Sequence, residues 1–280
     1  MPGRPESDPS TLVYGPTMDI ASINGVNLAF TDSGPVDGGR TVVFSHGLLM
    51  DHEMFEPQIA ALAGQHRVIT WDERAHGETR APGPFSYWDS ARDLTGLLDH
   101  LGVDTAVLAG MSQGGFLSLR AALASPERIQ ALVLMGSQAG LEDPEKQASY
   151  EVLHQVWLDQ GPEPVQEIVA GIILGEGEWA SWYAKWATWA ERDRNEFTHA
   201  FRCLSDRDDI TERLGEITCP TLVIHGTADA AIPMERAREM ADGLGGSTAF
   251  VEIDGGTHAC NLTHPGPVNE AILAFLTSLD

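Results

Sequence analysis

The stretch Leu108–Gly115, Leu-Ala-Gly-Met-Ser-Gln-Gly-Gly, places a serine between two sequence patterns of different period. The run Thr105–Ala109 is short and continuously apolar, which is typical of a buried strand, whereas Phe116–Ala124 is typical of a helix. Ser112 is therefore expected at a sharp strand-to-helix corner, with its hydroxyl projecting from a strained backbone. The same sequence is also compatible with a glycine-rich turn in which Ser112 only caps the helix.

Two glycines, Gly110 and Gly114, flank this serine. Because glycine has no Cβ, a strand and a helix can pass close together at such a corner. A helix that begins here also directs free N–H groups and the positive end of its dipole toward Ser112. These features suit a negative charge that develops on a substrate oxygen, so the corner indicates a serine placed for nucleophilic chemistry.

Short apolar runs alternate with helical patterns along most of the chain. The expected strands are residues 19–23, 26–30, 41–45, 67–71, 105–109, 131–135, 221–225 and 248–253, and the expected helices are 54–62, 87–101, 116–124 and 265–279. The first two strands flank Asn24-Gly25, a dipeptide favoured in tight hairpin turns. This alternation predicts an α/β fold with a mostly parallel eight-stranded sheet covered by helices. Functional loops are then expected at the carboxyl ends of the strands.

One segment, residues 140–216, has helical patterns and no convincing strand. We predict that it forms a helical cap inserted into a core domain of residues 17–139 and 217–280, after a flexible N-terminus at residues 1–16. The segment holds five of the seven tryptophans, namely Trp157, Trp179, Trp182, Trp186 and Trp189. The last four fall on one helical face. Most of this face is expected to pack against the core, with Trp182 and Trp186 lining an apolar substrate tunnel.

The composition excludes several classes of partner. The formal net charge is −24, and Lys146 and Lys185 are the only lysines among 17 basic residues. Without a basic patch, binding to nucleic acid or to an anionic membrane surface is not expected. Residues 206–209, Asp-Arg-Asp-Asp, have the wrong spacing for a calcium loop and are predicted to form a solvated turn that caps the helix before Cys219.

The cysteines and the N-terminus point to a reducing compartment. Cys203, Cys219 and Cys260 are odd in number and lack metal-ligand spacing, so packed or idle thiols are expected. Residues 1–10 contain no apolar core, and no later run is long enough to span a bilayer. A cytoplasmic protein is therefore expected, without a metal or a cofactor, and nothing in the sequence fixes its oligomeric state.

A serine hydroxyl is a weak nucleophile at neutral pH and needs a base, usually a histidine oriented by a carboxylate. Asp229 follows the expected strand 221–225, and His258 follows the strand 248–253. The order serine, aspartate, histidine is the one expected for a nucleophile elbow. Ser112, Asp229 and His258 are therefore the candidate catalytic triad.

Other residues could take two of these roles. Glu142 or Asp143, just after the strand 131–135, could supply the carboxylate in place of Asp229. His264 could replace His258, but it directly precedes Pro265 at the start of the last helix, where a capping role explains it. We favour Asp229 because its position at a strand end fits the geometry of a triad.

Together these motifs resemble the α/β-hydrolase superfamily from about Val42 to the C-terminus. The resemblance rests on the histidine-glycine loop at residues 46–47, the Asp-x-Arg-x-x-Gly turn at 72–77, the elbow, the late aspartate and the glycine-flanked histidine. It implies that Ser112 is the nucleophile, His258 the general base and then acid, and Asp229 the residue that orients His258. It also implies an oxyanion hole formed by the backbone N–H groups of Leu48 and Gln113.

In the same resemblance, His46 and the turn residues Asp72, Arg74 and His76 are structural. Ala75 stands where the superfamily commonly has glycine, which puts the local geometry of the turn in doubt.

A serine nucleophile argues against haloalkane dehalogenase and epoxide hydrolase chemistry, which in this fold uses a carboxylate. Residues 50–58 and the stretch around Ser112 are most similar to bacterial esterases and to the 3-oxoadipate enol-lactonase group. The expected substrate-binding residues, which favour a hydrophobic ester or lactone, are Leu49, Met50, Met111, Trp182 and Trp186.

We therefore expect a carboxylesterase, with a lactonase as the second hypothesis. Carbon–carbon bond hydrolysis, perhydrolysis and ligand binding without catalysis are further alternatives. An anionic lactone would need a cationic contact, for which the cap offers Arg192, Arg194, Arg202 and Arg207.

Overall fold

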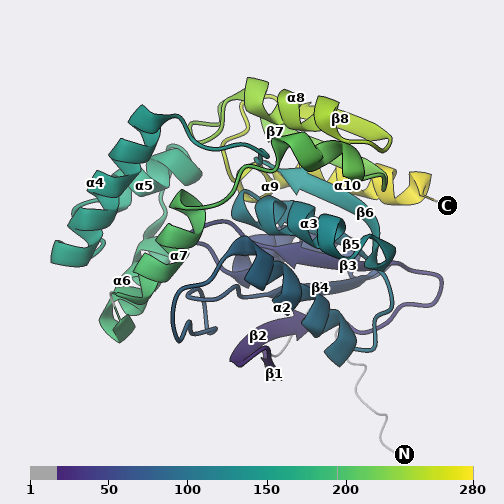
Figure 1. The fold of residues 1–280 in the computed structure, drawn as a ribbon, viewed down its shortest axis with the longest axis horizontal. Helices are drawn as coiled ribbons and strands as arrows, with labels where there is room; N and C mark the ends of the chain where they lie inside the picture. Colours follow the sequence, from purple (N-terminus) through teal and green to yellow (C-terminus); the bar gives the residue numbers. More distant parts are fainter. Residues whose placement is uncertain (1–17, 194, 280) are drawn as a thin grey trace, which may run out of the picture.

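A computed structural model describes residues 18–193 and 195–279 of the chain. Its eight strands form one sheet in the order β1-β2-β4-β3-β5-β6-β7-β8 (Figure 1). The strands are β1 Asp19–Ile23, β2 Val26–Asp32, β3 Thr41–Ser45, β4 Arg67–Trp71, β5 Ala106–Met111, β6 Ile129–Met135, β7 Thr221–Gly226 and β8 Thr248–Ile253. β3 to β8 run parallel to one another, and β2 is antiparallel to both β1 and β4. The predicted eight-stranded, mostly parallel sheet is confirmed.

The turn between β1 and β2 explains their pairing. Asn24 and Gly25 have φ angles of 48° and 81°. Two successive residues with positive φ are required by the hairpin turn whose twist matches that of the strands. The register pairs Ile23 with Val26 directly across this turn, as the Asn-Gly dipeptide predicts.

Helices cover both faces of the sheet and enclose two hydrophobic cores. The helices outside the segment 140–216 are α1 Glu56–Leu62, α2 Tyr87–His100, α3 Gln113–Ala124, α8 Met234–Gly243, α9 Cys260–Thr263 and α10 Pro265–Ser278. α2, α3 and α8 pack on the face to which Leu108 of β5 points. α1 and α10 pack on the other face with Val107 and Ala109. Because successive residues of a strand point to opposite faces, β5 is apolar along its whole length.

Between β6 and β7 every element that the structure describes is helical. These elements are α4 Pro144–Gln160, α5 Gln166–Ile173, α6 Ala180–Asp193, α7 Glu196–Ser205 and the 3-10 helix Thr211–Glu216. α4 to α7 lie together at one side of the sheet (Figure 1), and we call them the helical insertion. The domain boundaries at residues 140 and 216 stay a prediction, and the predicted flexible N-terminus lies outside the described residues.

The segment 206–209 is exposed at its three aspartates, as the predicted solvated turn requires, but its arginine is buried. Arg207 is buried, and its guanidinium donates hydrogen bonds to the carbonyl oxygens of Leu204, at 2.9 Å, and Gly140, at 2.8 Å. Asp208 accepts from the fully buried Arg120 at 2.8 Å. The predicted capping is present as well, since Asp209 accepts from the N–H of Thr211 at the start of the 3-10 helix. Charge alone did not predict the burial of Arg207, because its partner Gly140 lies far away in the sequence.

The turn after β4 is buried and structural. The carboxylate of Asp72 accepts hydrogen bonds from the backbone N–H groups of His52 and Glu78, both at 2.9 Å. Ala75 has a φ angle of 67°, in the left-handed region that favours glycine. The turn therefore keeps the geometry that glycine would allow, at the cost of some backbone strain.

Two further observations concern the chain as a whole. Among the described helices, none is long and apolar enough to cross a bilayer. All three cysteines are free thiols, and Cys203 and Cys260 are buried.

Candidate active site

Ser112 occupies the corner between β5 and α3. Its φ and ψ angles are 51° and −114°, a conformation that L-residues rarely adopt. Such a conformation costs about 1–3 kcal/mol and persists only where the surrounding structure imposes it. Ser112 is followed at once by Gln113, the first residue of α3, so the serine lies at the helix N-terminus as predicted.

The glycines at this corner allow the close approach that the sequence predicts. A Cβ on Gly110 would overlap the carbonyl oxygen of Gly114. A Cβ on Gly114 would in turn overlap the carbonyl oxygen of Ser45, at the end of β3. The strained serine is therefore held by backbone on two sides, and neither glycine can be replaced without moving the elbow.

His258 and Asp229 meet beyond the carboxyl ends of β8 and β7. The Nδ1 atom of His258 lies 2.9 Å from Oδ2 of Asp229. The other oxygen of Asp229 accepts from the backbone N–H groups of Ala231 and Ile232, both at 2.8 Å. Burial alone would raise the pKa of Asp229, but the attraction and the hydrogen bond of His258 outweigh it and hold the pKa below its ordinary value. Asp229 is therefore an ionised carboxylate that orients the imidazole.

A second histidine contacts the same carboxylate, and the sequence analysis missed it. His225 in β7 is fully buried, and its Nε2 atom lies 3.3 Å from Oδ2 of Asp229 and 2.8 Å from the carbonyl oxygen of Ile232. Burial lowers the pKa of His225, so a neutral imidazole donates from Nε2. The only signal in the sequence was a histidine at the end of an apolar strand, four residues before the aspartate.

The alternatives to Asp229 and His258 lie elsewhere. Glu142 accepts from Gln138 at 2.7 Å and from Arg207 at 3.2 Å. Asp143 pairs with an arginine on the surface, and Nδ1 of His264 lies 3.0 Å from the hydroxyl of its neighbour in the chain. The structure thus brings Asp229, rather than either acidic rival, to His258.

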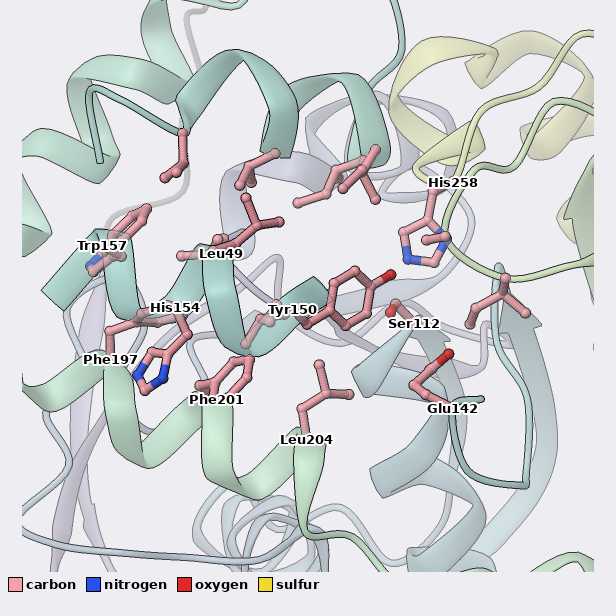
Figure 2. Close-up of a pocket in the computed structure, with 18 of the residues that line it drawn as sticks. Leu49, Ser112, Glu142, Tyr150, His154, Trp157, Phe197, Phe201, Leu204 and His258 are labelled. Atoms are coloured by element: carbon pink, nitrogen blue, oxygen red, sulfur yellow. The ribbon is translucent and has the colours of Figure 1, made fainter. Parts of the chain in front are cut away.

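A cavity between the sheet and the helical insertion contains both Ser112 and His258. It encloses roughly 840 Å³ of empty space, counting the part open to solvent. Figure 2 shows Ser112, His258, Glu142 and Tyr150 at one end, and His154, Trp157 and Phe197 at the other. The lining also includes Leu48, Leu49, Met111, Phe116, Leu153, Val165, Val169, Ile172, Ile173, Phe201, Leu204, Ala231 and Ile232. The walls are therefore almost entirely apolar.

Two of the five predicted substrate-binding residues line this cavity, namely Leu49 and Met111. The predictions for Met50, Trp182 and Trp186 are corrected, because all three are buried in the core outside the cavity.

Trp186 instead fixes the insertion to the core, since its Nε1 donates to the carbonyl oxygen of Leu49 at 2.7 Å. The tryptophan that does reach the cavity is Trp157, on α4. The tryptophan spacing shows that several rings share one face of α6, but it does not show whether that face meets the cavity or the core.

The two predicted oxyanion-hole residues lie beside Ser112. Gln113 is the first residue of α3, so its backbone N–H has no carbonyl partner within the helix. Leu48 lines the cavity in the loop after β3.

A chain of hydrogen bonds links the segments that carry these two residues. Nδ1 of His46 bonds the carbonyl oxygen of Gly47 at 2.8 Å, and Nε2 of His46 accepts from the backbone N–H of Glu73 at 2.9 Å. The carboxyl of Glu73 accepts from the side chain of Gln113 at 2.6 Å. The structural role expected for His46 agrees with these bonds, whereas no motif in the sequence predicted a role for Glu73.

No lysine or arginine lines the cavity among the described residues. Arg207 is engaged with Glu142, Arg202 with Glu151 at 2.5 Å, and the Arg192 guanidinium with the carbonyl oxygen of Gly77 at 2.5 Å. Arg194 lies outside the described residues. In the same described part of the chain, no group of three or more His, Cys, Asp or Glu side chains is arranged to hold a metal ion.

Two family models match the chain. One describes the alpha/beta hydrolase fold and matches residues 40–171, and the other describes a TAP-like protein and matches residues 200–280. RutD of Azorhizobium caulinodans, a relative named as a carbamate hydrolase, is 32% identical over 255 residues, which cover 86% of this chain and 93% of the relative. The chain belongs to the α/β-hydrolase superfamily. The family predicted from the motifs is therefore confirmed.

Other relatives of this α/β hydrolase are named for different reactions. The 3-oxoadipate enol-lactonase 1 of Acinetobacter baylyi is 25% identical over 277 residues, covering 93% of this chain and 97% of the relative. The structure of an esterase from Thermogutta terrifontis matches with a TM-score of 0.82 at 27% identity, covering 94% of this chain and 99% of that chain. An enol-lactonase from Burkholderia xenovorans LB400 also gives 0.82 at 27% identity, covering 92% and 100%. Because these names span carbamates, lactones and esters, the substrate must be inferred from the cavity itself.

Proposed function

We propose that this α/β hydrolase cleaves a carboxylic ester of a small, hydrophobic substrate through an acyl-enzyme intermediate. The observation that carries the proposal is the position of His258, held by Asp229 at 2.9 Å, in the same apolar cavity as the strained Ser112. A nucleophile, a base and an orienting carboxylate at one end of a cavity are the components that acyl transfer requires.

The mechanism follows from the role of each group. His258 removes the proton of the Ser112 hydroxyl, and the serine oxygen attacks the acyl carbon. The backbone N–H groups of Leu48 and Gln113 stabilise the oxyanion that forms. His258 then protonates the leaving alcohol, and a water molecule activated by His258 hydrolyses the acyl-enzyme. Asp229 keeps the Nδ1 proton of His258 in place and stabilises the imidazolium.

The cavity supports a hydrophobic substrate. Its walls are aliphatic and aromatic, and Glu142, the one carboxylate among the described lining residues, is bonded to Arg207 and Gln138. Burial of an apolar group against such walls contributes about 25 cal/mol per Å² of apolar surface. An uncharged acyl or alcohol chain that reaches from Ser112 toward Trp157 would gain most from this lining.

A lactone is the second candidate, and the two enol-lactonase relatives favour it. The mechanism is the same, except that the leaving alcohol stays attached to the acyl group. The lack of a cationic lining residue in the described cavity argues against an anionic lactone and favours a neutral one.

Hydrolysis of p-nitrophenyl butyrate by the wild type and by Ser112→Ala tests the proposal. The wild type should turn the ester over, and the alanine variant should lose about three orders of magnitude or more in kcat. Ser149→Ala, at an exposed serine of α4, is the matched control and should keep normal kcat. Normal turnover by Ser112→Ala would refute the mechanism, and saturable ligand binding by a wild type without turnover would favour a binding protein.

A further inference from the structure

Tyr150 introduces a polar group at the reacting end of an otherwise apolar cavity. It belongs to α4 of the helical insertion and is half-buried in the cavity wall. Figure 2 shows its hydroxyl pointing toward Ser112 and His258 rather than toward the aromatic end. Its ring contacts the ammonium of Lys146 at 5.9 Å, but its hydroxyl forms no hydrogen bond with any residue that the structure describes. The hydroxyl is therefore free to bond a substrate.

The surroundings of Tyr150 keep this hydroxyl protonated. Burial raises the pKa of Tyr150, and the carboxylates of Glu142 and Asp229 raise it further. A neutral phenol can donate one hydrogen bond at any pH at which the enzyme works. Tyr150 is therefore a donor, and it complements an oxygen of the substrate that gains negative charge.

An ester offers two oxygens near Ser112. In the proposed function the carbonyl oxygen faces the N–H groups of Leu48, in the loop after β3, and of Gln113, at the N-terminus of α3. The alkoxy oxygen must lie near His258, which protonates it as the bond to the acyl carbon breaks. The carbonyl oxygen already has its two donors, so the alkoxy oxygen is the acceptor left for the Tyr150 hydroxyl, which points toward His258 from the helical insertion.

We propose that the Tyr150 hydroxyl donates a hydrogen bond to the alkoxy oxygen of the scissile ester or lactone. This inference rests on the proposed function. As the Ser112 Oγ–carbon bond forms and the carbon–alkoxy bond breaks, the serine proton passes through His258 to the alkoxy oxygen. Tyr150 keeps its own proton throughout and stabilises the charge that develops before the transfer is complete. The helical insertion thus contributes directly to the reaction.

This role makes a prediction that depends on the leaving group. A basic alkoxide needs more stabilisation by donors than a nitrophenolate, which is stable by itself. The effect of Tyr150 should therefore grow from 4-nitrophenyl butyrate to phenyl butyrate to ethyl butyrate. The effect of a tyrosine that only shaped the cavity would not grow with the basicity of the leaving alkoxide.

The test measures kcat/KM, which reports the acylation step, for these three esters with the wild type and Tyr150→Phe. We expect Tyr150→Phe to lose about 10- to 100-fold on ethyl butyrate, as for a hydrogen bond to a charged oxygen, and less than about threefold on the nitrophenyl ester. Tyr183→Phe is the matched control, because Tyr183 is a half-buried tyrosine of α6 outside the cavity, and it should match the wild type on all three esters.

An equal loss on all three esters, or no loss on ethyl butyrate, would overturn the role of Tyr150. A different result marks failure of the proposed function itself, namely a wild type that hydrolyses none of the esters. Thermal unfolding of both variants checks that the helical insertion stays folded. Tyr150→Phe should keep the wild-type Tm, because it removes no hydrogen bond seen within the described chain.

Discussion

Asp229 is the residue that orients the proposed general base, His258. One of its oxygens is held by two backbone N–H groups, and the other faces His258 and the buried His225. Every contact of the carboxylate is thus with a donor. This arrangement fixes the imidazole so that the proton stays on Nδ1 and Nε2 is free to act as the base toward Ser112.

Replacing Asp229 with asparagine should keep the shape of the site but present a donor to His258. The imidazole would then adopt the wrong tautomer, and kcat should fall by roughly 10⁴-fold. Asp143→Asn is the matched control, since Asp143 was also a candidate for the carboxylate but pairs with Arg236 on the surface instead of with a histidine. Ester hydrolysis by both variants at pH 7 measures the difference. Similar losses in the two variants would contradict the assignment of Asp229.

The sequence could identify individual residues only where position and chemical type agreed. Ser112, Asp229 and His258 each follow a predicted strand, so the topology of a parallel sheet was enough to group them. Glu73 and His225 were not predicted as site residues because each is a single polar residue within a buried segment. The partner of Glu73, Gln113, lies 40 residues away in the sequence. His225 contacts Asp229 because of how the chain folds back after β7, which the sequence does not show.

The segment after β6 packs closely against His258. Gly136 follows β6 with a φ angle of 51°. A Cβ there would lie 2.7 Å from the carbonyl oxygen of His258, 3.2 Å from its Nδ1 and 3.5 Å from Oδ2 of Asp229. A side chain at this position would therefore disturb both the backbone and the hydrogen bond between the histidine and the aspartate.

Gly136→Ala should destabilise the fold by about 1–3 kcal/mol, because alanine is strained at this φ angle and its Cβ meets the backbone of His258. It should also lower kcat by displacing the imidazole. Gly171→Ala, in α5, is the control, because a Cβ there meets nothing within 4 Å and helix propensity favours alanine by about 1 kcal/mol. Urea unfolding and ester hydrolysis measure both effects. A Gly136→Ala variant as stable and active as the wild type would show that this packing is dispensable.

Strands were easier to predict than the orientation of helices. A parallel strand covered on both faces is a continuous apolar run, which has few other interpretations. In the helical insertion, the tryptophan spacing showed a common face on α6 but not its partner. Trp182 and Trp186 pack into the core, whereas Trp157, from another helix, reaches the cavity. The surface that an apolar helix face contacts depends on how several helices pack together. The sequence of one helix alone does not determine it.

The stability of the whole molecule should depend on pH through three buried groups. Burial lowers the pKa of His46 to about 4 and that of His76 to about 3, so both are neutral in the folded protein. Burial raises the pKa of Glu73 to about 8, and one of its oxygens has no hydrogen-bond partner among the described residues. The carboxylate of Asp93 raises this pKa too, whereas Ser90, Arg74 and Gln113 lower it.

The direction follows from the protons bound in each state. Between about pH 4 and 6.5 the unfolded histidines bind protons that the folded ones do not, so stability rises with pH despite Glu73. Between 6.5 and 8 the folded Glu73 keeps a proton that the unfolded chain has lost, so stability falls, by about 1.4 kcal/mol per pH unit. The free energy of unfolding should therefore be greatest near pH 6.5.

Glu73→Gln should reduce the decline above pH 6.5, because glutamine does not titrate; the part that remains belongs to His52, whose pKa is held above its ordinary value, against burial, by the hydrogen bond and charge of Asp72. Urea unfolding at pH 5, 6.5 and 8 measures this, with the exposed Glu56→Gln as the control that should keep the wild-type profile. Equal declines in the wild type and Glu73→Gln between pH 6.5 and 8 would show that Glu73 is already ionised in the folded protein.

Covalent labelling tests most directly whether Ser112 is the nucleophile of a working triad. The wild type and Ser112→Ala are treated with a fluorophosphonate, and the intact masses and labelled peptides are determined. The wild type should gain one phosphonyl group per chain, on Ser112, in step with its loss of esterase activity, and Ser112→Ala should gain none. Loss of activity with the label on another residue, or an active wild type that stays unlabelled, would contradict the proposed mechanism.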